Sequence, residues 1–155
     1  MKYAQTIGGT AAAIFVLSSS VLAQQSQFGT AQEARSMLDR AVIAVKADKA
    51  AALASVNSGQ GGFKDRDLYP FCFNLSDGKF VAGLKQLLGT DARSLKDASG
   101  KVFGPELYAV AQKPEGQISE VSYLWPRPGG EQAPVAKVTF VTRAGDLGCG
   151  VGYYK

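Results

Sequence analysis

Leu68-Tyr69-Pro70-Phe71-Cys72-Phe73-Asn74, followed after a short turn by Phe80-Val81-Ala82, is the stretch that decides the fold. Alternate residues of a strand point to opposite faces, so Tyr69, Phe71 and Phe73 are expected on one face. Ser76-Asp77-Gly78-Lys79 favours a tight turn, because Asp and Gly tolerate the positive φ that such turns require. We therefore expect a β-hairpin over residues 68–83. Pro70 offers no ladder donor, so either the strand begins at Phe71 or the Pro70 nitrogen faces away from a neighbouring strand.

The C-terminal stretch Gly148-Cys149-Gly150-Val151-Gly152-Tyr153-Tyr154 predicts a second apolar strand, and it carries the only other cysteine. Gly148, Gly150 and Gly152 share one face of that strand, which permits close approach of a backbone or a ligand. They are not a nucleotide-binding fingerprint, because no phosphate-binding helix follows them.

The rest of the chain supplies two more strands and three helical segments. Alternating patterns predict strands at Gln117–Trp125 and Val135–Thr142. A capping box, Thr30 with Glu33, begins a helix that we expect to run to about Asn57. Shorter helical pieces are expected over residues 84–88 and 105–112, the second with Pro105 at its first position. This order predicts an α+β domain with a five-stranded antiparallel sheet.

The first 23 residues have the character of a secretory signal peptide, with cleavage between Ala23 and Gln24. A membrane anchor is the alternative, but the apolar run is short for a span of about 20 residues. Residues 24–29 are then a mobile polar lead, and residues 30–155 are one domain. We expect a periplasmic or secreted protein with no membrane span after signal removal.

Composition narrows the chemistry. Lys and Arg exceed Asp and Glu by 17 to 13, but they are scattered, so nucleic-acid binding is not expected. The chain has no histidine, which removes the commonest general base and metal ligand. We expect no enzyme, no metal site and no cofactor. In an exported protein two cysteines are first interpreted as one disulfide, with two free buried thiols as the alternative.

Two further patterns leave alternatives open. One stripe of the N-terminal helix is apolar and either packs on its own domain or forms a dimer seam. Its residues are Ala34, Met37, Leu38, Ala41, Val42 and Val45. Asp65 and Asp67 are a weak calcium pattern, and a solvated turn is the simpler interpretation.

The collinear set of segments resembles the single Cache domain, a PAS-like extracellular sensor module of bacteria. The segments are Asp67–Asn74, Asp77-Gly78-Lys79, Leu95–Phe103, Tyr123-Leu124-Trp125-Pro126 with Pro128, Pro134–Val141 and Gly150–Tyr154. The resemblance covers roughly residues 30–155. It implies a PAS-like sheet with the long N-terminal helix on one face and short helices on the other.

The same resemblance implies more about the cysteines and the ligand. The first strand would lie beside the last, which places Cys72 next to Cys149 for a disulfide. A small-ligand pocket would lie between the other face of the sheet and the segment after the second strand. Family members often have a His-Pro segment there, whereas this chain has Ala82-Gly83-Leu84. Family members often belong to chemoreceptors and sensor kinases, whereas here we expect the domain to stand alone behind its signal peptide.

Aromatic and basic side chains are the candidates for ligand contact. Tyr69, Phe71, Phe103, Tyr108, Tyr123 and Trp125 are expected to supply pocket walls, with plain core packing as the alternative for each. Lys137 interrupts an apolar strand face and Arg127 follows the tryptophan, so either is a candidate partner for a ligand carboxylate. Snorkelling of Lys137 to solvent is the alternative for that residue.

We therefore expect an exported sensor or carrier that binds a small organic acid, amino acid or similar metabolite, with an anionic ligand favoured by the basic candidates. The resemblance implies chemotaxis or other signal transduction as the setting. It would present that ligand to a membrane receptor, sensor kinase or transport partner. The alternative is a non-catalytic accessory interaction protein whose pocket is filled by its own side chains, and a dimer through the N-terminal helix would favour it.

Overall fold

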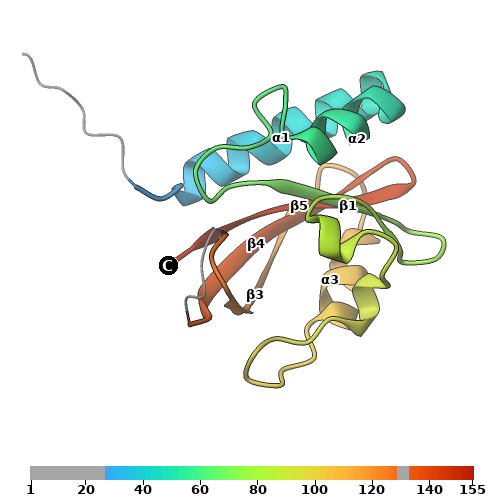
Figure 1. The fold of residues 1–155 in the computed structure, drawn as a ribbon. Helices are drawn as coiled ribbons and strands as arrows, with labels where there is room; N and C mark the ends of the chain where they lie inside the picture. Colours follow the sequence, from blue (N-terminus) through green and yellow to red (C-terminus); the bar gives the residue numbers. More distant parts are fainter. Residues whose placement is uncertain (1–26, 129–132) are drawn as a thin grey trace, which may run out of the picture.

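A five-stranded antiparallel sheet is the centre of the computed structural model, which describes residues 27–128 and 133–155 (Figure 1). The strands are β1 (Pro70–Asn74), β2 (Phe80–Ala82), β3 (Ser119–Trp125), β4 (Val135–Ala144) and β5 (Leu147–Tyr154), in the order β2-β1-β5-β4-β3. Helices α1 (Ala31–Ala47) and α2 (Lys49–Ser58) cover one face, and α3 (Gly104–Ala111) lies on the other. The expected signal peptide and its Ala23/Gln24 cleavage site lie outside the described residues.

The hairpin and the strand neighbours are confirmed. Cys72 pairs with Ala82 on β2 and with Cys149 on β5, so the first strand does lie beside the last. Gly78 has a φ of 77°, which the turn requires, and its N–H donates to the Asn74 carbonyl at 2.9 Å. Pro70 is the first residue of β1, a position that tolerates its missing donor.

The N-terminal helix is two helices, so the expectation of one helix to about Asn57 was wrong. The capping box at Thr30 and Glu33 is present as predicted. The break falls at Asp48, whose backbone is extended and whose carboxylate accepts the Ala51 N–H at 3.0 Å. A short carboxylate competes with the helix for backbone donors and favours a cap. The alanines on both sides favour helix equally, so helix propensity does not reveal the break.

Each face of the sheet has its own core. The apolar stripe of α1 is buried against Cys72, Cys149 and Val151. It therefore packs on the chain's own sheet, and its buried members are not free to form a dimer seam. The second core gathers Phe71, Phe73, Phe80, Phe103, Leu107, Val121, Tyr123 and Val141.

Short segments complete the second face. Two 3₁₀ turns, Lys85–Leu87 and Ala92–Ser94, follow β2, and α3 begins one residue before Pro105. The backbone of Gly104 packs so closely on Ala92 that a Cβ at position 104 would lie 2.2 Å from the Ala92 carbonyl oxygen.

Among the described residues, no helix is both long and apolar enough to cross a membrane.

Candidate functional site

A small cavity lies on the α3 side of the sheet, where the resemblance places the ligand pocket. Six of the eight predicted ligand residues line it: Tyr69, Phe71, Phe103, Tyr123, Trp125 and Lys137. Leu84 and Leu87, from the segment after β2, form its outer wall. The cavity is therefore bounded by sheet residues on one side and by an irregular segment on the other.

The aromatic walls pack against one another as well as around the cavity. The rings of Phe103 and Tyr123 are stacked with centroids 3.9 Å apart, and Trp125 meets both edge to face. The free volume that remains is about 20 Å³, which is room for about one water molecule. The aromatic side chains are thus both core and cavity lining, and a larger occupant requires the outer wall to move.

Lys137 is the one basic side chain of the cavity, and it is 2% exposed. Its Nζ donates to the Tyr69 hydroxyl at 2.9 Å and to the Tyr154 hydroxyl at 3.4 Å. The same nitrogen lies 4.3 Å and 4.6 Å from the centroids of those two rings. The snorkelling alternative is therefore wrong, because the amine lies inside the fold and not in solvent.

No carboxylate among the described residues forms an ion pair with Lys137. Burial lowers the pKa of Lys137 to about 7, with a small opposing effect from the Asp67 charge. Burial also raises the pKa of Tyr69 and of Tyr123, so both phenols stay protonated. Tyr123 and Thr139 share a hydrogen bond of 2.7 Å beside the amine. The polar end of the cavity thus offers hydroxyl groups and one amine on the border of protonation.

The alternating glycines of β5 make room for this arrangement. A Cβ at Gly152 would lie 2.3 Å from Cε of Lys137, and one at Gly150 would lie 2.5 Å from the ring of Phe71. Contacts under 3 Å are not tolerated without a shift of the neighbour. The glycines therefore let Lys137 and Phe71 lie flat across the neighbouring strand.

Tyr108 and Arg127, the other two predicted ligand residues, do not line the cavity. Tyr108 stacks on Phe73 and donates to the Leu75 carbonyl at 2.5 Å. Arg127 bonds Asp67 at 3.1 Å, with both side chains largely buried at 15% and 7% exposed. Its guanidinium also lies 4.8 Å from the centre of the Tyr154 ring, so it contacts a residue that also bonds Lys137.

Asp67 is buried, so a solvated turn was the wrong interpretation of that residue. Besides Arg127, its carboxylate accepts the Gly29 N–H at 2.7 Å. The guanidinium of Arg127 lies 3.8 Å from the centre of the Phe28 ring. The last residues of the N-terminal lead, which was expected to be mobile, are therefore attached to the domain.

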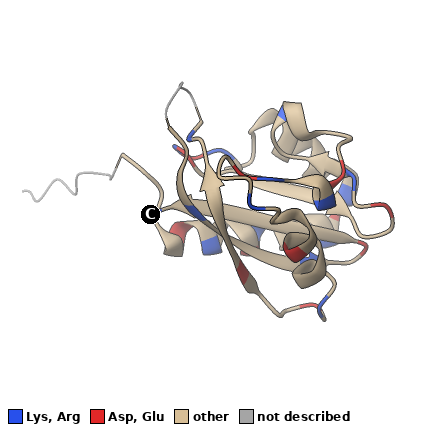
Figure 2. Cartoon of the chain, turned by 90° about the horizontal axis from the view of Figure 1, so that it is seen from below, with Lys and Arg blue, Asp and Glu red and all other residues tan. Residues whose placement is uncertain are grey.

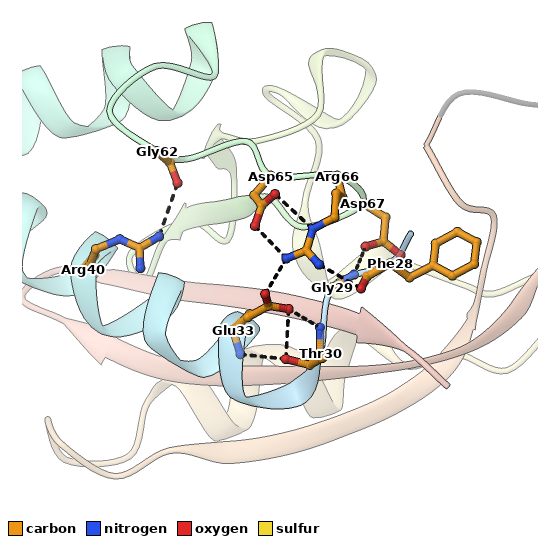
Figure 3. Close-up of polar contacts among 9 residues, drawn as sticks. All are labelled: Phe28, Gly29, Thr30, Glu33, Arg40, Gly62, Asp65, Arg66 and Asp67. Carbon is orange, nitrogen blue, oxygen red and sulfur yellow. Dashed lines mark hydrogen bonds and ion pairs between the residues drawn. The ribbon is translucent and has the colours of Figure 1, made fainter. Parts of the chain in front are cut away.

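A second ionic cluster joins the same lead to the loop before β1 (Figure 3). Arg66, whose φ is 54°, donates to Asp65, to Glu33 and to the Phe28 carbonyl. Positive φ is uncommon for a non-glycine residue, so these acceptors stabilise the conformation. Hydrogen bonds from the Thr30 backbone and from Arg66 lower the pKa of Glu33 to about 2. Asp65 is therefore one partner of an ion pair.

The disulfide lies on the opposite face from the cavity. Cys72 and Cys149 are bonded and their Cα atoms are 4.1 Å apart, as the strand order implied. Both are fully buried beneath α1. Among the residues that the structure describes, no group of three His, Cys, Asp or Glu side chains could hold a metal ion.

Sequence reasoning missed several members of the cavity. Phe80, Leu84, Leu87, Leu95 and Leu107 line it, and Tyr154 and Thr139 surround the amine. The positions of Tyr154 and Thr139 were predictable from strand alternation. Thr139 shares a face of β4 with Lys137, and Tyr154 shares a face of β5 with Gly152. The leucines lie in irregular segments and one short helix, where no strand period indicates the direction of a side chain.

This sheet order, with the N-terminal helices on one face and a cavity under the segment after β2 on the other, defines a PAS-like sensor fold. The chain belongs to the single Cache domain family, since the family model described as Single Cache domain 2 matches residues 21–153.

Solved structures share this fold. A periplasmic sensor domain of a chemotaxis protein is 24% identical, with a TM-score of 0.58 over 79% of this chain and 88% of that one. A methyl-accepting chemotaxis protein from Vibrio parahaemolyticus is 22% identical, with a TM-score of 0.61 over 79% and 86%. A Cache chemosensory domain, described for its recognition of carboxylic acid, is 22% identical, with a TM-score of 0.57 over 79% and 86%. Curated protein sequences gave no significant match.

Proposed function

We propose that this chain is an exported Cache sensor or carrier domain that binds a small carboxylate in the cavity beside Lys137. The observation that carries the proposal is the buried amine of Lys137, which faces the cavity and has no carboxylate partner among the described residues. A buried charge is costly unless it is paired. A ligand carboxylate would provide that pair and would accept hydrogen bonds from the amine and from Tyr69.

The aromatic walls suit the remainder of such a ligand. Phe71, Phe103 and Trp125 offer apolar surface around a few placed polar groups, which is the usual composition of a small-molecule site. The small free volume favours a short acid over a large one. The acids of interest are therefore short aliphatic and hydroxy acids, together with small amino acids.

The family and the fold neighbours support the same interpretation. One neighbour is described for carboxylic acid recognition, and another as a periplasmic sensor domain. We therefore propose a periplasmic or secreted location and a signalling or transport partner that recognises the loaded domain. Lys and Arg positions are interspersed with Asp and Glu positions along the ribbon in the view of Figure 2.

A thermal-shift titration tests the proposal. Acetate, propionate, lactate and alanine are compared with propionamide, which has nearly the shape of propionate without its charge. Binding to the native state at a hundredfold excess over Kd stabilises a protein by about 2.7 kcal/mol, which shifts the Tm of a domain of this size by several degrees. We expect a saturable shift with at least one acid and none with propionamide.

Two lysine variants make the test specific. Lys137→Met keeps the length of the side chain and removes the amine, and it should abolish the shift. Lys96→Met makes the same change of charge at an exposed position and should retain it. No shift with any acid, or an equal shift in the Lys137 variant, would overturn the proposal.

The limited free volume favours one second candidate. A cavity with room for about one water molecule is also what a self-filled core leaves. The chain would then be a non-catalytic accessory protein that acts through its surface. The same titration separates the two functions, because a self-filled core gains no stability from any of the acids.

A further inference from the structure

A surface groove of about 240 Å³ lies directly outside the cavity. It is formed by the end of α2, by the loop that leads to β1 and by residues 83–85. Two side chains, Tyr69 and Leu84, line both the groove and the cavity. They are therefore the partition between the enclosed space and the surface.

The partition is fixed on the side of α2 and continues into a short exposed segment on the other side. At the fixed edge Asn57 of α2 bonds the Val81 carbonyl at 3.1 Å and the Gly83 N–H at 3.0 Å. Gly83 has a φ of 129°, and a Cβ there would lie 2.8 Å from Cβ of Phe71. Residues 84–88 are exposed or only partly buried, and the chain is bonded to β2 again at Gly89 and Thr90, whose backbones bond Phe80 at 2.9 Å and 3.0 Å. Leu84 is thus the first residue after a clamped glycine, which suits a hinge.

Cationic side chains border the groove. Lys64 and Lys85 are exposed there and form no ion pair with the described carboxylates. Unpaired like charges at the mouth of a cleft attract anions and raise their association rate. The groove therefore has the charge that a carboxylate would meet first.

We propose that a small carboxylate reaches the cavity from this groove, with Tyr69 and Leu84 as the gate and with Lys64 and Lys85 attracting the anion. This inference rests on the proposed function, because it assigns a route to the same ligand. It adds a site outside the cavity and explains how a space of only about 20 Å³ is loaded. Opening requires displacement of Leu84 and of the exposed segment behind it, and leaves the sheet in place.

Stopped-flow fluorescence tests the route. Trp125 is the only tryptophan of the chain and lines the cavity, so it reports occupancy directly. The probe is propionate, or whichever of the four acids above binds most tightly. Leu84→Ala removes the gate, and Leu95→Ala is the matched control, because it deletes the same atoms from the cavity lining, lies outside the segment that moves and does not line the groove.

Replacing a gate residue is expected to change the association and the dissociation rate constants of the ligand in the same direction. We expect Leu84→Ala to raise the association and dissociation rate constants in parallel, each on the order of fivefold relative to Leu95→Ala. A residue that acts only as cavity wall changes affinity mainly through dissociation. Equal association rate constants in the two variants would overturn the gate while leaving the proposed function intact.

The charges are tested separately. The Lys64→Gln/Lys85→Gln variant should lower the association rate constant at low ionic strength and approach the wild-type value at high salt. Lys79→Gln/Lys96→Gln makes the same charge change at exposed positions outside the groove. An equal loss in both variants would overturn the role of Lys64 and Lys85. If the equilibrium titration shows no saturable binding in the wild type, the proposed function fails, and the route fails with it.

Discussion

Replacing Lys137 with Met should make the empty protein more stable while removing its ligand affinity. The side chain is buried, its amine has no described carboxylate partner, and burial lowers its pKa from 10.5 to about 7. Buried charged groups are often replaced by apolar residues of similar volume at no cost or with a gain of stability. Met has a similar length and fits the aromatic surroundings.

The pKa shift gives the magnitude and the pH dependence. Each unit of pKa difference between the folded and unfolded states corresponds to about 1.4 kcal/mol. At about pH 7.5 the unfolded chain holds the Lys137 proton and the folded chain has lost most of it, which disfavours folding by about 4 kcal/mol. The variant leaves the Tyr69 hydroxyl without this partner, at a cost of about 2 kcal/mol. The net gain for Lys137→Met at that pH is therefore about 2 kcal/mol.

The sign follows from proton binding. Between about pH 7 and pH 10 the unfolded state binds more protons at this lysine than the folded state, so wild-type stability from this group rises with pH. The penalty falls to about 2 kcal/mol by about pH 9, and the advantage of the Met variant then disappears. Below about pH 7 the lysine is charged in both states and the advantage is at its largest.

Urea unfolding at several pH values from about 6.5 to 9 measures this directly, with Lys96→Met as the control. An exposed lysine is expected to change the free energy of unfolding by no more than about 0.5 kcal/mol, without this pH dependence. A Lys137→Met variant that is less stable than the wild type at neutral pH, or a stability difference that is constant across the pH range, would contradict this prediction.

The remaining predictions concern the disulfide, the glycine face and the acid range. The double variant Cys72→Ala/Cys149→Ala opens a loop spanning 77 residues and should lower the urea-derived free energy of unfolding by about 4 kcal/mol; a loss under about 1 kcal/mol would contradict this. Gly152→Ala places a Cβ against Lys137 Cε, so it should weaken carboxylate binding by about tenfold or more, as loss of a charge-assisted hydrogen bond does; unchanged affinity by titration would show that the amine does not move. The pKa of Glu33 is lowered to about 2, so its contribution to stability is present above about pH 4.5 and is lost as the pH falls towards 2. The Glu33→Gln variant should therefore lack this loss of stability when it is unfolded by acid.

Local signals predicted most of the fold. The capping box at Thr30 and Glu33 marked the start of α1, and the alternation at Phe71 and Phe73 placed both on the cavity face. The break at Asp48 was missed, because the residue that caps the second helix interrupts a sequence that favours helix on both sides. Strand order came from the family resemblance, since antiparallel strands distant in sequence carry no local mark of their neighbours.

The site was only partly predictable, for a physical reason. Lys137 was identified because it interrupts an apolar face, but its burial depends on Gly152, which lies on the neighbouring strand. Arg127 was a reasonable candidate by type, and its partner Asp67 lies 60 residues away in sequence. Whether a basic side chain faces a cavity or forms an ion pair is decided by contacts between distant segments, and the period of a single strand does not contain them.

The two faces of the sheet differ in how much movement they permit. On the α1 face the disulfide and the buried stripe of α1 join β1 and β5 to the first helix. On the other face Lys137 and the segment after Gly83 line the cavity, and Gly150 and Gly152 of β5 lie against two of its lining side chains. Movement on loading is therefore expected at the segment after β2, because the disulfide fixes β1 against β5 and α1 is packed on these strands. The contacts of Tyr154 with both Lys137 and Arg127 then connect the polar end of the cavity to Asp67 and, through it, to the start of the domain. A charge that appears or disappears beside Lys137 is thus connected to Gly29 through three side chains, those of Tyr154, Arg127 and Asp67.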